Sequence, residues 1–156
     1  NDVGRVVNPM IVEGQLDGGA IQGMGQLTQA YPFTHILGIE SRGFIFAAAL
    51  ANHLNKGLVL VRKPNKLPPE THRESYGLEY GNDALEISTN VLGANDSVLV
   101  VDDVLATGGT IMAARQLIGR TGAKVSGAIC LLEIAGLEGA ERLRNAGVSN
   151  QCLLKM

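Results

Sequence analysis

The sequence lacks several features that would point to particular classes of protein. It has no excess of basic charge, since 13 Lys and Arg residues stand against 15 Asp and Glu residues, for a formal net charge of -2. Nucleic-acid binding through a broad basic surface is therefore disfavoured. No apolar run approaches the roughly 20 residues that cross a bilayer, and the first residues lack a signal-peptide pattern. We expect a cytoplasmic protein without nucleic-acid or membrane partners, in which any anion site is local.

Cysteine is also scarce, and Cys130 and Cys152 are the only two. Both stand in apolar runs, which is typical of small core residues in a reducing compartment. An even number still permits one disulfide. Apolar residues, in contrast, are abundant: they make up 46% of the 156 residues, enough for one compact domain with a core.

From Thr34 onward, strand and helix patterns alternate. The apolar runs predict strands over residues 35–40, 57–63, 84–89, 97–101, 124–134 and 151–154, and helices over residues 43–54, 110–120 and 137–147. The helix at 43–54 is apolar nearly all round, which predicts that it is buried. Strands interleaved with helices predict an α/β fold with a central, mostly parallel sheet flanked by helices.

A polar stretch, PNKLPPETHRESYGLEYGND, interrupts this pattern at residues 64–83. Long stretches without predicted structure inside a compact domain are usually functional loops or disordered segments. We predict a flexible lid here, with Gly77 and Gly81 permitting it to bend.

The run VLVVDDVLATGGT, residues 98–110, predicts a strand, a tight turn and the start of a helix. Gly108 and Gly109 allow positive φ angles and a close approach of the backbone to a ligand. The free N–H groups at the start of the helix attract anions, and the hydroxyls of Thr107 and Thr110 add donors. The turn is thus a candidate phosphate cradle.

Asp102 and Asp103 stand just before this turn, at the sheet edge where doubly wound folds bind their ligands. Carboxylates beside a phosphate would repel it unless something intervenes. Either Mg²⁺, which bridges carboxylates and phosphates through its waters, or the hydroxyls of a sugar would resolve the conflict. The pattern therefore predicts a sugar-phosphate site.

The same run resembles the phosphoribosyl pyrophosphate (PRPP) motif of type I phosphoribosyltransferases. Four further stretches are similar, in order and spacing, to the adenine phosphoribosyltransferase family: GIESRGFIFAAALA, VRKPNKLPPET, YGLEYGNDALEI and LLEIAGLEGAERL. The resemblance runs from about Ile36 to Lys155. It implies the type I phosphoribosyltransferase fold, a homodimer, and transfer of the 5-phosphoribosyl group from PRPP to adenine, giving AMP and pyrophosphate. It also implies Mg²⁺ as cofactor, held by PRPP and water with no direct protein ligand.

The resemblance assigns roles to particular residues. PRPP or AMP would be bound by Asp102, Asp103, Ala106, Thr107, Gly108, Gly109 and Thr110. Pyrophosphate would be bound by Ser41, Arg42, Arg62, Lys63 and Lys66, some of which would reach into the adjacent subunit. The pyrophosphate turn would carry a cis peptide bond between Glu40 and Ser41. From the residues alone, Arg62, Lys63 and Lys66 could be an ordinary solvated charge run, and Arg42 could simply cap a surface turn.

The catalytic assignments rest on the resemblance too. In LEYG, Glu79 would exchange a proton with the purine and Tyr80 would close over PRPP. Without the resemblance, Glu79 would be read as a solvated loop residue. Val104 or Leu105 would form an apolar face against the base.

Residues 1–33 depart from this family. The stretch at 4–26 closely resembles a segment of the large subunits of molybdenum hydroxylases, of the xanthine and carbon monoxide dehydrogenase type. Six of the 20 glycines fall in the first 25 residues, where even spacing gives about three. We interpret the chain as a chimera of an atypical segment, residues 1–33, and a phosphoribosyltransferase core, residues 34–156. A glycine-rich helix within 15–31 would pack where the family's own N-terminal helices lie.

Because the family's N-terminal hood over adenine is missing, an alternative function stays open. The chain could be a PRPP- or nucleotide-binding domain with little or no transferase activity. Transfer to another purine is a narrower alternative, against which the lid sequence argues.

Overall fold

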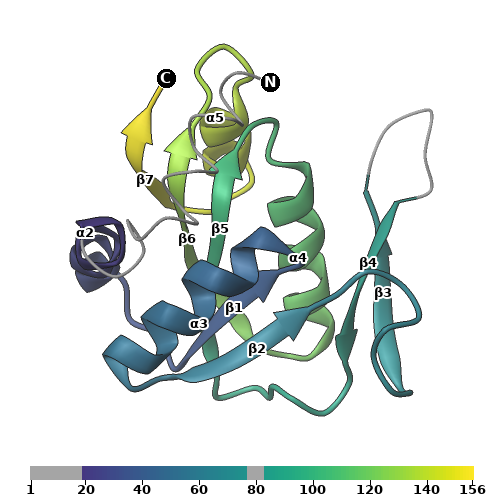
Figure 1. The fold of residues 1–156 in the computed structure, drawn as a ribbon. Helices are drawn as coiled ribbons and strands as arrows, with labels where there is room; N and C mark the ends of the chain where they lie inside the picture. The colour runs from purple at the N-terminus through teal and green to yellow at the C-terminus, as the bar shows by residue number, and fades with distance from the viewer. Residues whose placement is uncertain (1–18, 77–82) are drawn as a thin grey trace.

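The structure, a computed structural model, describes residues 19–76 and 83–156. The helices of these residues are α2 (Gly19–Leu27), the 3-10 helix η2 (Thr28–Ala30), α3 (Arg42–Leu54), α4 (Gly109–Arg120) and α5 (Gly139–Asn145). The strands are β1 (His35–Ile39), β2 (Gly57–Val61), β3 (Thr71–Ser75), β4 (Ala84–Ser88), β5 (Ser97–Leu105), β6 (Lys124–Glu133) and β7 (Asn150–Lys155). Figure 1 shows their arrangement.

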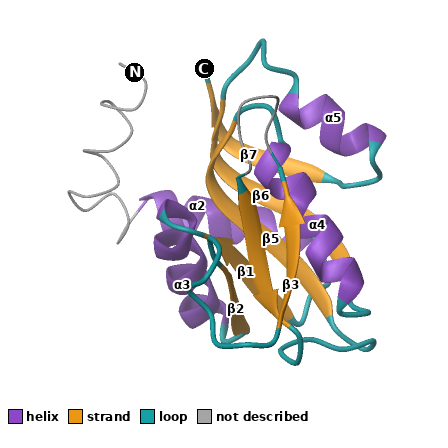
Figure 2. Ribbon diagram, turned by 90° about the vertical axis from the view of Figure 1, so that its right-hand side faces the viewer, coloured by secondary structure: helices purple, strands orange, loops and turns teal. Residues whose placement is uncertain are grey.

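The central sheet has the strand order β2-β1-β5-β6-β7, and every neighbouring pair is parallel. Its inner strands are buried on both faces, as a continuous apolar sequence requires. Figure 2 shows α2 and α3 on one side of this sheet and α4 and α5 on the other. The predicted α/β fold is confirmed.

The β3–β4 hairpin corrects two details of the prediction. β4, predicted within the strand-helix alternation, lies outside the central sheet and pairs antiparallel with β3. β3 itself lies inside the stretch 64–83, where only a lid loop is predicted. The described residues between β2 and β4 contain no helix that could form the parallel crossover needed to place β4 in the central sheet. The hairpin instead buries Leu85 and Ile87 in the core that contains α4.

Helix α3 is not buried all round. Phe46 and Leu50 are fully buried against the sheet, whereas Ile45 on another face is 42% exposed. A single chain therefore leaves part of this apolar helix in contact with solvent.

Helix α2 packs into the same core as α3. Ile21 and Met24 are buried there, and a Cβ atom at Gly23 would lie 2.9 Å from Leu153 of β7. The absence of a side chain at Gly23 thus allows α2 to approach β7 closely. The predicted helix within 15–31 is confirmed over the described residues; residues 15–18 lie outside them.

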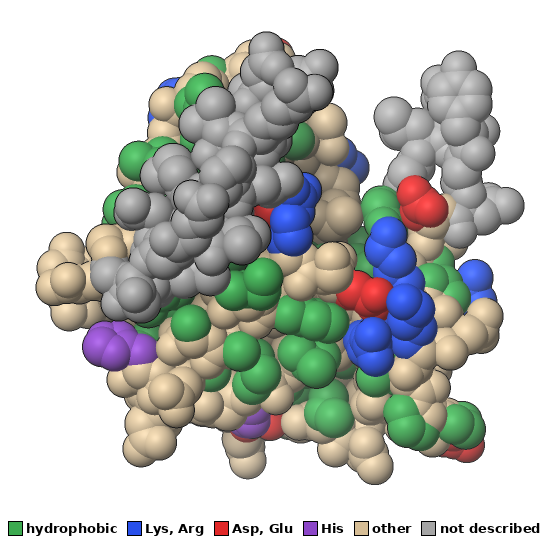
Figure 3. All heavy atoms as spheres, viewed as in Figure 1, with side chains coloured by type: hydrophobic (Ala, Val, Ile, Leu, Met, Phe, Trp, Pro, Cys, Tyr) green, Lys and Arg blue, Asp and Glu red, His purple; other side chains and the backbone are tan. Residues whose placement is uncertain are grey.

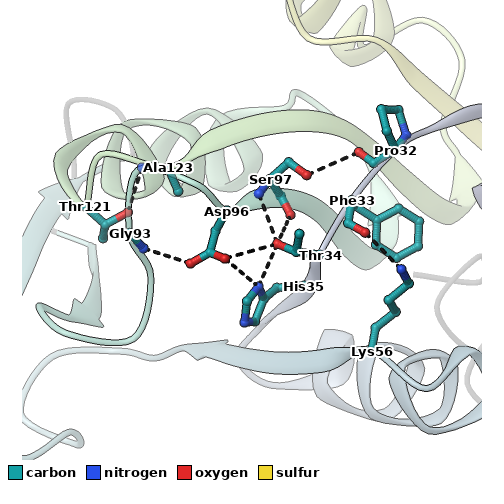
Figure 4. A network of polar contacts seen from close by, with 10 residues as sticks. All are labelled: Pro32, Phe33, Thr34, His35, Lys56, Gly93, Asp96, Ser97, Thr121 and Ala123. Carbon is teal, nitrogen blue, oxygen red and sulfur yellow. Dashed lines mark hydrogen bonds and ion pairs between the residues drawn. The ribbon is translucent and has the colours of Figure 1, made fainter.

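A polar network joins the amino ends of β1 and β5 (Figure 4). The backbone N–H of Thr34 donates to the carbonyl of Ser97 at 2.8 Å, and the N–H of Ser97 donates back to the Thr34 hydroxyl at 3.0 Å. Asp96 Oδ2 accepts the N–H of Gly93 at 2.9 Å, and Asp96 Oδ1 lies 3.7 Å from Nδ1 of His35. These contacts fix the register of the two strands.

The two cysteines face each other across β6 and β7, where they pair in register. Both are free thiols; Cys130 is buried in the core, as predicted, and Cys152 is half-buried. Within residues 19–76 and 83–156, no helix combines the length and apolar character needed to span a membrane.

Candidate active site

Two carboxylates lie side by side in the last part of β5. Asp102 and Asp103 are 9% and 6% exposed. Oδ1 of Asp102 accepts the backbone N–H of Asp103 at 2.9 Å, and Oδ1 of Asp103 accepts the N–H of Val104 at 2.8 Å. Nε of Arg42 forms an ion pair with Oδ2 of Asp103 at 2.9 Å, but its geometry is not that of a hydrogen bond. Among the described residues, this buried oxygen accepts no hydrogen bond.

The electrostatics of the pair are unfavourable to two full charges. Burial, followed by the neighbouring charge of Asp103, raises the pKa of Asp102 well above its ordinary range, and the charge of Arg42 opposes this only in part. Buried carboxylates that lack full partners are uncommon in a purely structural role. The pair is therefore a candidate ligand-binding site.

The turn after β5 has the geometry of an anion cradle. Gly108 adopts φ 86° and ψ 4°, a left-handed conformation that favours glycine, and α4 begins at the next residue. No side chain caps the start of α4, and the N–H of Gly109 has only a 3.4 Å contact with the Thr107 hydroxyl. The first N–H groups of a helix have no partner within it, so they remain available to a ligand.

A third carboxylate, Glu40, contacts cations beside the turn that precedes α3. Its Oε1 lies 3.3 Å from Nε of Arg62 and accepts the backbone N–H of Lys63 at 2.9 Å, and its Oε2 accepts from Nζ of Lys66 at 3.0 Å. Burial would raise the pKa of Glu40, but these hydrogen bonds and the two positive charges outweigh it, and the net pKa is lowered. The peptide bond between Glu40 and Ser41 is cis, as the resemblance implied.

An open cleft of about 1010 Å³ lies between the hairpin and the start of α4. Its lining combines the turn after β5, one face of α4, the ends of the hairpin strands and one residue of α5: Glu74, Ser75, Tyr76, Asp83, Val104, Leu105, Ala106, Thr107, Gly108, Gly109, Thr110, Ile111, Met112, Ala113, Gln116 and Arg142. Val104 is half-buried, whereas Leu105 is 1% exposed and belongs to the core.

The structure thus brings the predicted phosphate and base residues together in one cleft. The predicted pyrophosphate residues and the two aspartates do not line it: Ser41, Arg42, Arg62, Lys63, Lys66, Asp102 and Asp103. The ion pair between Arg42 and Asp103 connects the two groups. Glu79 and Tyr80 lie outside the described residues.

Three residues near the site were missed by sequence reasoning about function. Glu40 belongs to the quoted ESRG turn, but the cations it contacts lie 22 to 26 residues further along the chain, so no local pattern marked it. Tyr76 lines the cleft directly after β3; burial, then the charges of Asp83 and Asp102, raises its pKa. Arg142 had no signal, because nothing in an exposed helix residue indicates which loop it reaches.

The comparisons with known proteins agree with this geometry. The sequence model of the phosphoribosyl transferase domain matches residues 22–150. The chain therefore belongs to the phosphoribosyltransferases. A model of the molybdopterin cofactor-binding domain also matches residues 1–30, of which residues 1–18 lie outside the described part of the chain.

Proteins of similar sequence show to which family of phosphoribosyltransferases the chain belongs. The adenine phosphoribosyltransferase of Polynucleobacter asymbioticus is 50% identical over 97% of this chain and 88% of its own length. That of Anaeromyxobacter dehalogenans is 56% identical over 72% of this chain and 66% of its own. Within the phosphoribosyltransferases, the chain belongs to the adenine phosphoribosyltransferase family.

Solved structures agree in fold. The adenine phosphoribosyltransferase of Thermoanaerobacter pseudethanolicus has a TM-score of 0.87 and 38% identity, over 94% of this chain and 84% of that one. The enzyme of Giardia lamblia, solved with 9-deazaadenine, has a TM-score of 0.86 and 32% identity, over 96% and 84%. The type I phosphoribosyltransferase architecture is confirmed.

Proposed function

We propose that this protein transfers the 5-phosphoribosyl group from PRPP to adenine, giving AMP and pyrophosphate, as an enzyme of purine salvage. The observation that carries the proposal is the buried pair Asp102 and Asp103, with an unsatisfied oxygen, next to the left-handed turn at Gly108. Family membership adds the identity of the base. The alternative of a PRPP-binding domain without transferase activity is not favoured, because relatives named as adenine phosphoribosyltransferases align over 97% of the chain.

In this proposal, PRPP lies across the edge of the sheet. The 5-phosphate occupies the turn from Ala106 to Thr110, where helix N–H groups and hydroxyls donate to it. The ribose hydroxyls donate to Asp102 and Asp103, and Oδ2 of Asp103 is the acceptor with unused capacity. Binding therefore satisfies an oxygen that the free protein leaves without a hydrogen bond.

Pyrophosphate is bound by Ser41, Arg42, Arg62, Lys63 and Lys66. Arg62 and Lys66 are already held near this turn by Glu40, so little side-chain entropy is lost when the anion binds. In the described residues, no group of three or more His, Cys, Asp or Glu side chains is placed so that it could hold a metal ion. Mg²⁺ fits the site as a partner of PRPP: Asp102 and Asp103 would hold it through water, and when bound it would neutralise charge on the departing pyrophosphate.

The transfer breaks the bond between C1 of the ribose and the pyrophosphate oxygen, and the electron pair leaves with pyrophosphate. A purine nitrogen of adenine forms the new bond to C1, and its proton passes to Glu79. Tyr80 closes over PRPP, and the half-buried Val104 provides the apolar face for the base, with Leu105 in the core behind it. Exclusion of water by residues 64–83 would prevent hydrolysis of PRPP.

The direct test incubates the protein with PRPP, Mg²⁺ and each of adenine, hypoxanthine and guanine, and separates the products by chromatography. We expect AMP and pyrophosphate in equal amounts with adenine, and little product with the other bases. PRPP binding by calorimetry without AMP formation would contradict the proposal and support the binding-domain alternative.

We further infer a homodimer, based on the exposed apolar surface of α3 and β2. Ile45, Leu58 and Leu60 are 42%, 41% and 38% exposed, and Figure 3 shows hydrophobic side chains gathered on this face beside a group of basic ones. A second copy would cover this surface. Sedimentation should give twice the mass of the chain, and Leu58→Glu should shift it toward the monomer; a monomeric wild type would refute the dimer.

We also infer that residues 1–33 form an N-terminal segment of separate origin from the core at 34–156. The match of residues 1–30 to a molybdopterin cofactor-binding domain supports this origin, although the Polynucleobacter relative aligns over nearly the whole chain. We assign the segment no molybdenum chemistry. Its role would be packing, so Met24→Ala should lower the free energy of unfolding by about 2 kcal/mol or more, and metal analysis should find no molybdenum.

The free thiols of Cys130 and Cys152, side by side in the sheet, agree with a reducing, cytoplasmic setting, which we propose for the enzyme.

A further inference from the structure

Helix α5 is built against the phosphate turn. A Cβ atom at Gly139, the first residue of α5, would lie 2.3 Å from the carbonyl oxygen of Ala106, so the helix and the turn touch through their backbones. Leu143, one turn later, is fully buried in the core and fixes the helix in place. The position of α5 therefore determines which of its side chains can reach the turn.

Arg142 is the side chain that reaches it. Its Nη1 donates to the carbonyl oxygen of Thr107 at 3.2 Å, across 35 residues of sequence. Arg142 also lines the cleft, together with the residues of the turn from Ala106 to Thr110. No carboxylate forms a salt bridge with it among the described residues, so its charge is not neutralised there.

The charges around the cleft make this position important. Of the described residues that line it, Glu74 and Asp83 are acidic and Arg142 is the one Lys or Arg side chain. The turn itself offers only neutral donors to a phosphate dianion. A guanidinium has five N–H donors in a planar fork, so it can bind one backbone carbonyl and a phosphate together.

We propose that Arg142 is a binding residue for the 5-phosphate of PRPP and AMP, in which one N–H holds the turn through Thr107 and the others donate to the phosphate. This rests on the proposed function for the identity of the ligand, but not for the presence of a phosphate site. The role is recognition of the phosphate, so it affects phosphorylated ligands and not the base.

The test compares AMP with adenosine, which differ only by the phosphate. Calorimetry should show that Arg142→Gln weakens AMP binding about tenfold, the size of one charge-assisted hydrogen bond, and leaves adenosine binding unchanged. Glutamine can still donate to the Thr107 carbonyl, so this variant isolates the charge. Arg142→Lys keeps the charge and should stay within about threefold of wild type.

Arg144 provides the matched control, because it is exposed on the same helix and does not line the cleft. Arg144→Gln should bind AMP like the wild type. Equal weakening of AMP and adenosine by Arg142→Gln, or no weakening of AMP, would overturn the assignment. If the wild type made no AMP from adenine and PRPP, the proposed function would fail separately, and ribose 5-phosphate binding by the same variants would still decide the role of Arg142.

Discussion

The two ends of the central sheet carry aspartates with opposite surroundings. At the amino end, Asp96 uses both carboxylate oxygens: Oδ2 accepts from Gly93 at 2.9 Å, and Oδ1 lies 3.5 Å from the Thr34 hydroxyl. It is also partly solvated, with 29% of its side chain exposed. At the carboxyl end, Asp102 and Asp103 are nearly buried, lie side by side, and leave one oxygen without a hydrogen bond.

The same residue type therefore serves two purposes at the two ends of β5, with Asp96 directly before the strand and Asp102 and Asp103 in its last part. Asp96 is satisfied by the protein, so its contacts stabilise the fold. The Oδ2 oxygen of Asp103 is ion-paired with Arg42 but accepts no hydrogen bond. A buried acceptor that accepts no hydrogen bond costs free energy, since the water that would have donated to it is gone. Its presence beside the phosphate turn is explained if a ligand provides the missing donor.

The largest effect on activity is expected when one charge at the carboxyl end is removed. Asp103→Asn should lower kcat/KM for PRPP by about a hundredfold, as expected when a preorganised polar group in contact with the reacting substrate is lost. Its free energy of unfolding should not fall. Steady-state kinetics and urea unfolding on the same preparation measure both; a stability loss with unchanged kinetics would mean that Asp103 is structural.

The contribution of Asp102 to the free energy of unfolding should depend on pH. Because its pKa is raised in the folded protein, the folded state binds a proton more tightly than the unfolded state between the ordinary pKa of 3.8 and the raised one. The contribution of Asp102 to stability is therefore unfavourable above the raised pKa and disappears as pH falls toward 3.8. Asp102→Asn should be more stable than wild type at neutral pH, with a gap that closes on acidification; a gap that is constant with pH would contradict this.

At the amino end, a substitution should lower stability and leave activity unchanged. Asp96→Ala removes the acceptor of the Gly93 N–H and should lower the free energy of unfolding by about 1 kcal/mol, while kcat and KM stay unchanged. Asp96→Asn keeps one carbonyl acceptor and serves as the matched control with a smaller loss. Chemical denaturation measures the free energy of unfolding, and the AMP assay measures kcat and KM.

A substitution of Glu40 tests whether the role of a carboxylate is set by its partners or by its position in the sheet. It lies at the carboxyl end but is fully paired, and its pKa is lowered in the folded state. Its stabilising contribution is present above its ordinary pKa and is lost as pH falls through the lowered one. Glu40→Gln should raise KM for PRPP about threefold, because Arg62 and Lys66 lose an ionic anchor, with kcat little changed; a loss as large as that of Asp103→Asn would contradict the distinction.

Much of the fold could be predicted from the sequence because the central strands are continuous apolar runs. β1, β5 and β6 are buried on both faces, so composition alone marks them. β3 could not be found this way: THRES has little apolar character, and it forms a strand because β4 supplies backbone hydrogen bonds. The exposed face of α3 was missed for a related reason, since an apolar sequence does not say whether a second chain covers it.

The candidate site likewise has a part that the sequence predicts and a part that it does not. The phosphate turn was predictable because its glycines, hydroxyls and helix start are consecutive in the sequence. Glu40 and Arg142 contribute through contacts across 22 to 35 residues, and such contacts depend on how the elements pack. No local pattern encodes them.

The most direct test of the central claim is the rise in melting temperature on adding Mg²⁺ and PRPP to the wild type, Asp103→Asn and Asp96→Asn. A ligand that binds only the folded state raises its stability by an amount that grows with the logarithm of ligand concentration over Kd. If the carboxyl-end pair exists for the ligand, the wild type and Asp96→Asn should show the same rise and Asp103→Asn should show little or none. Equal rises in all three proteins would contradict the account.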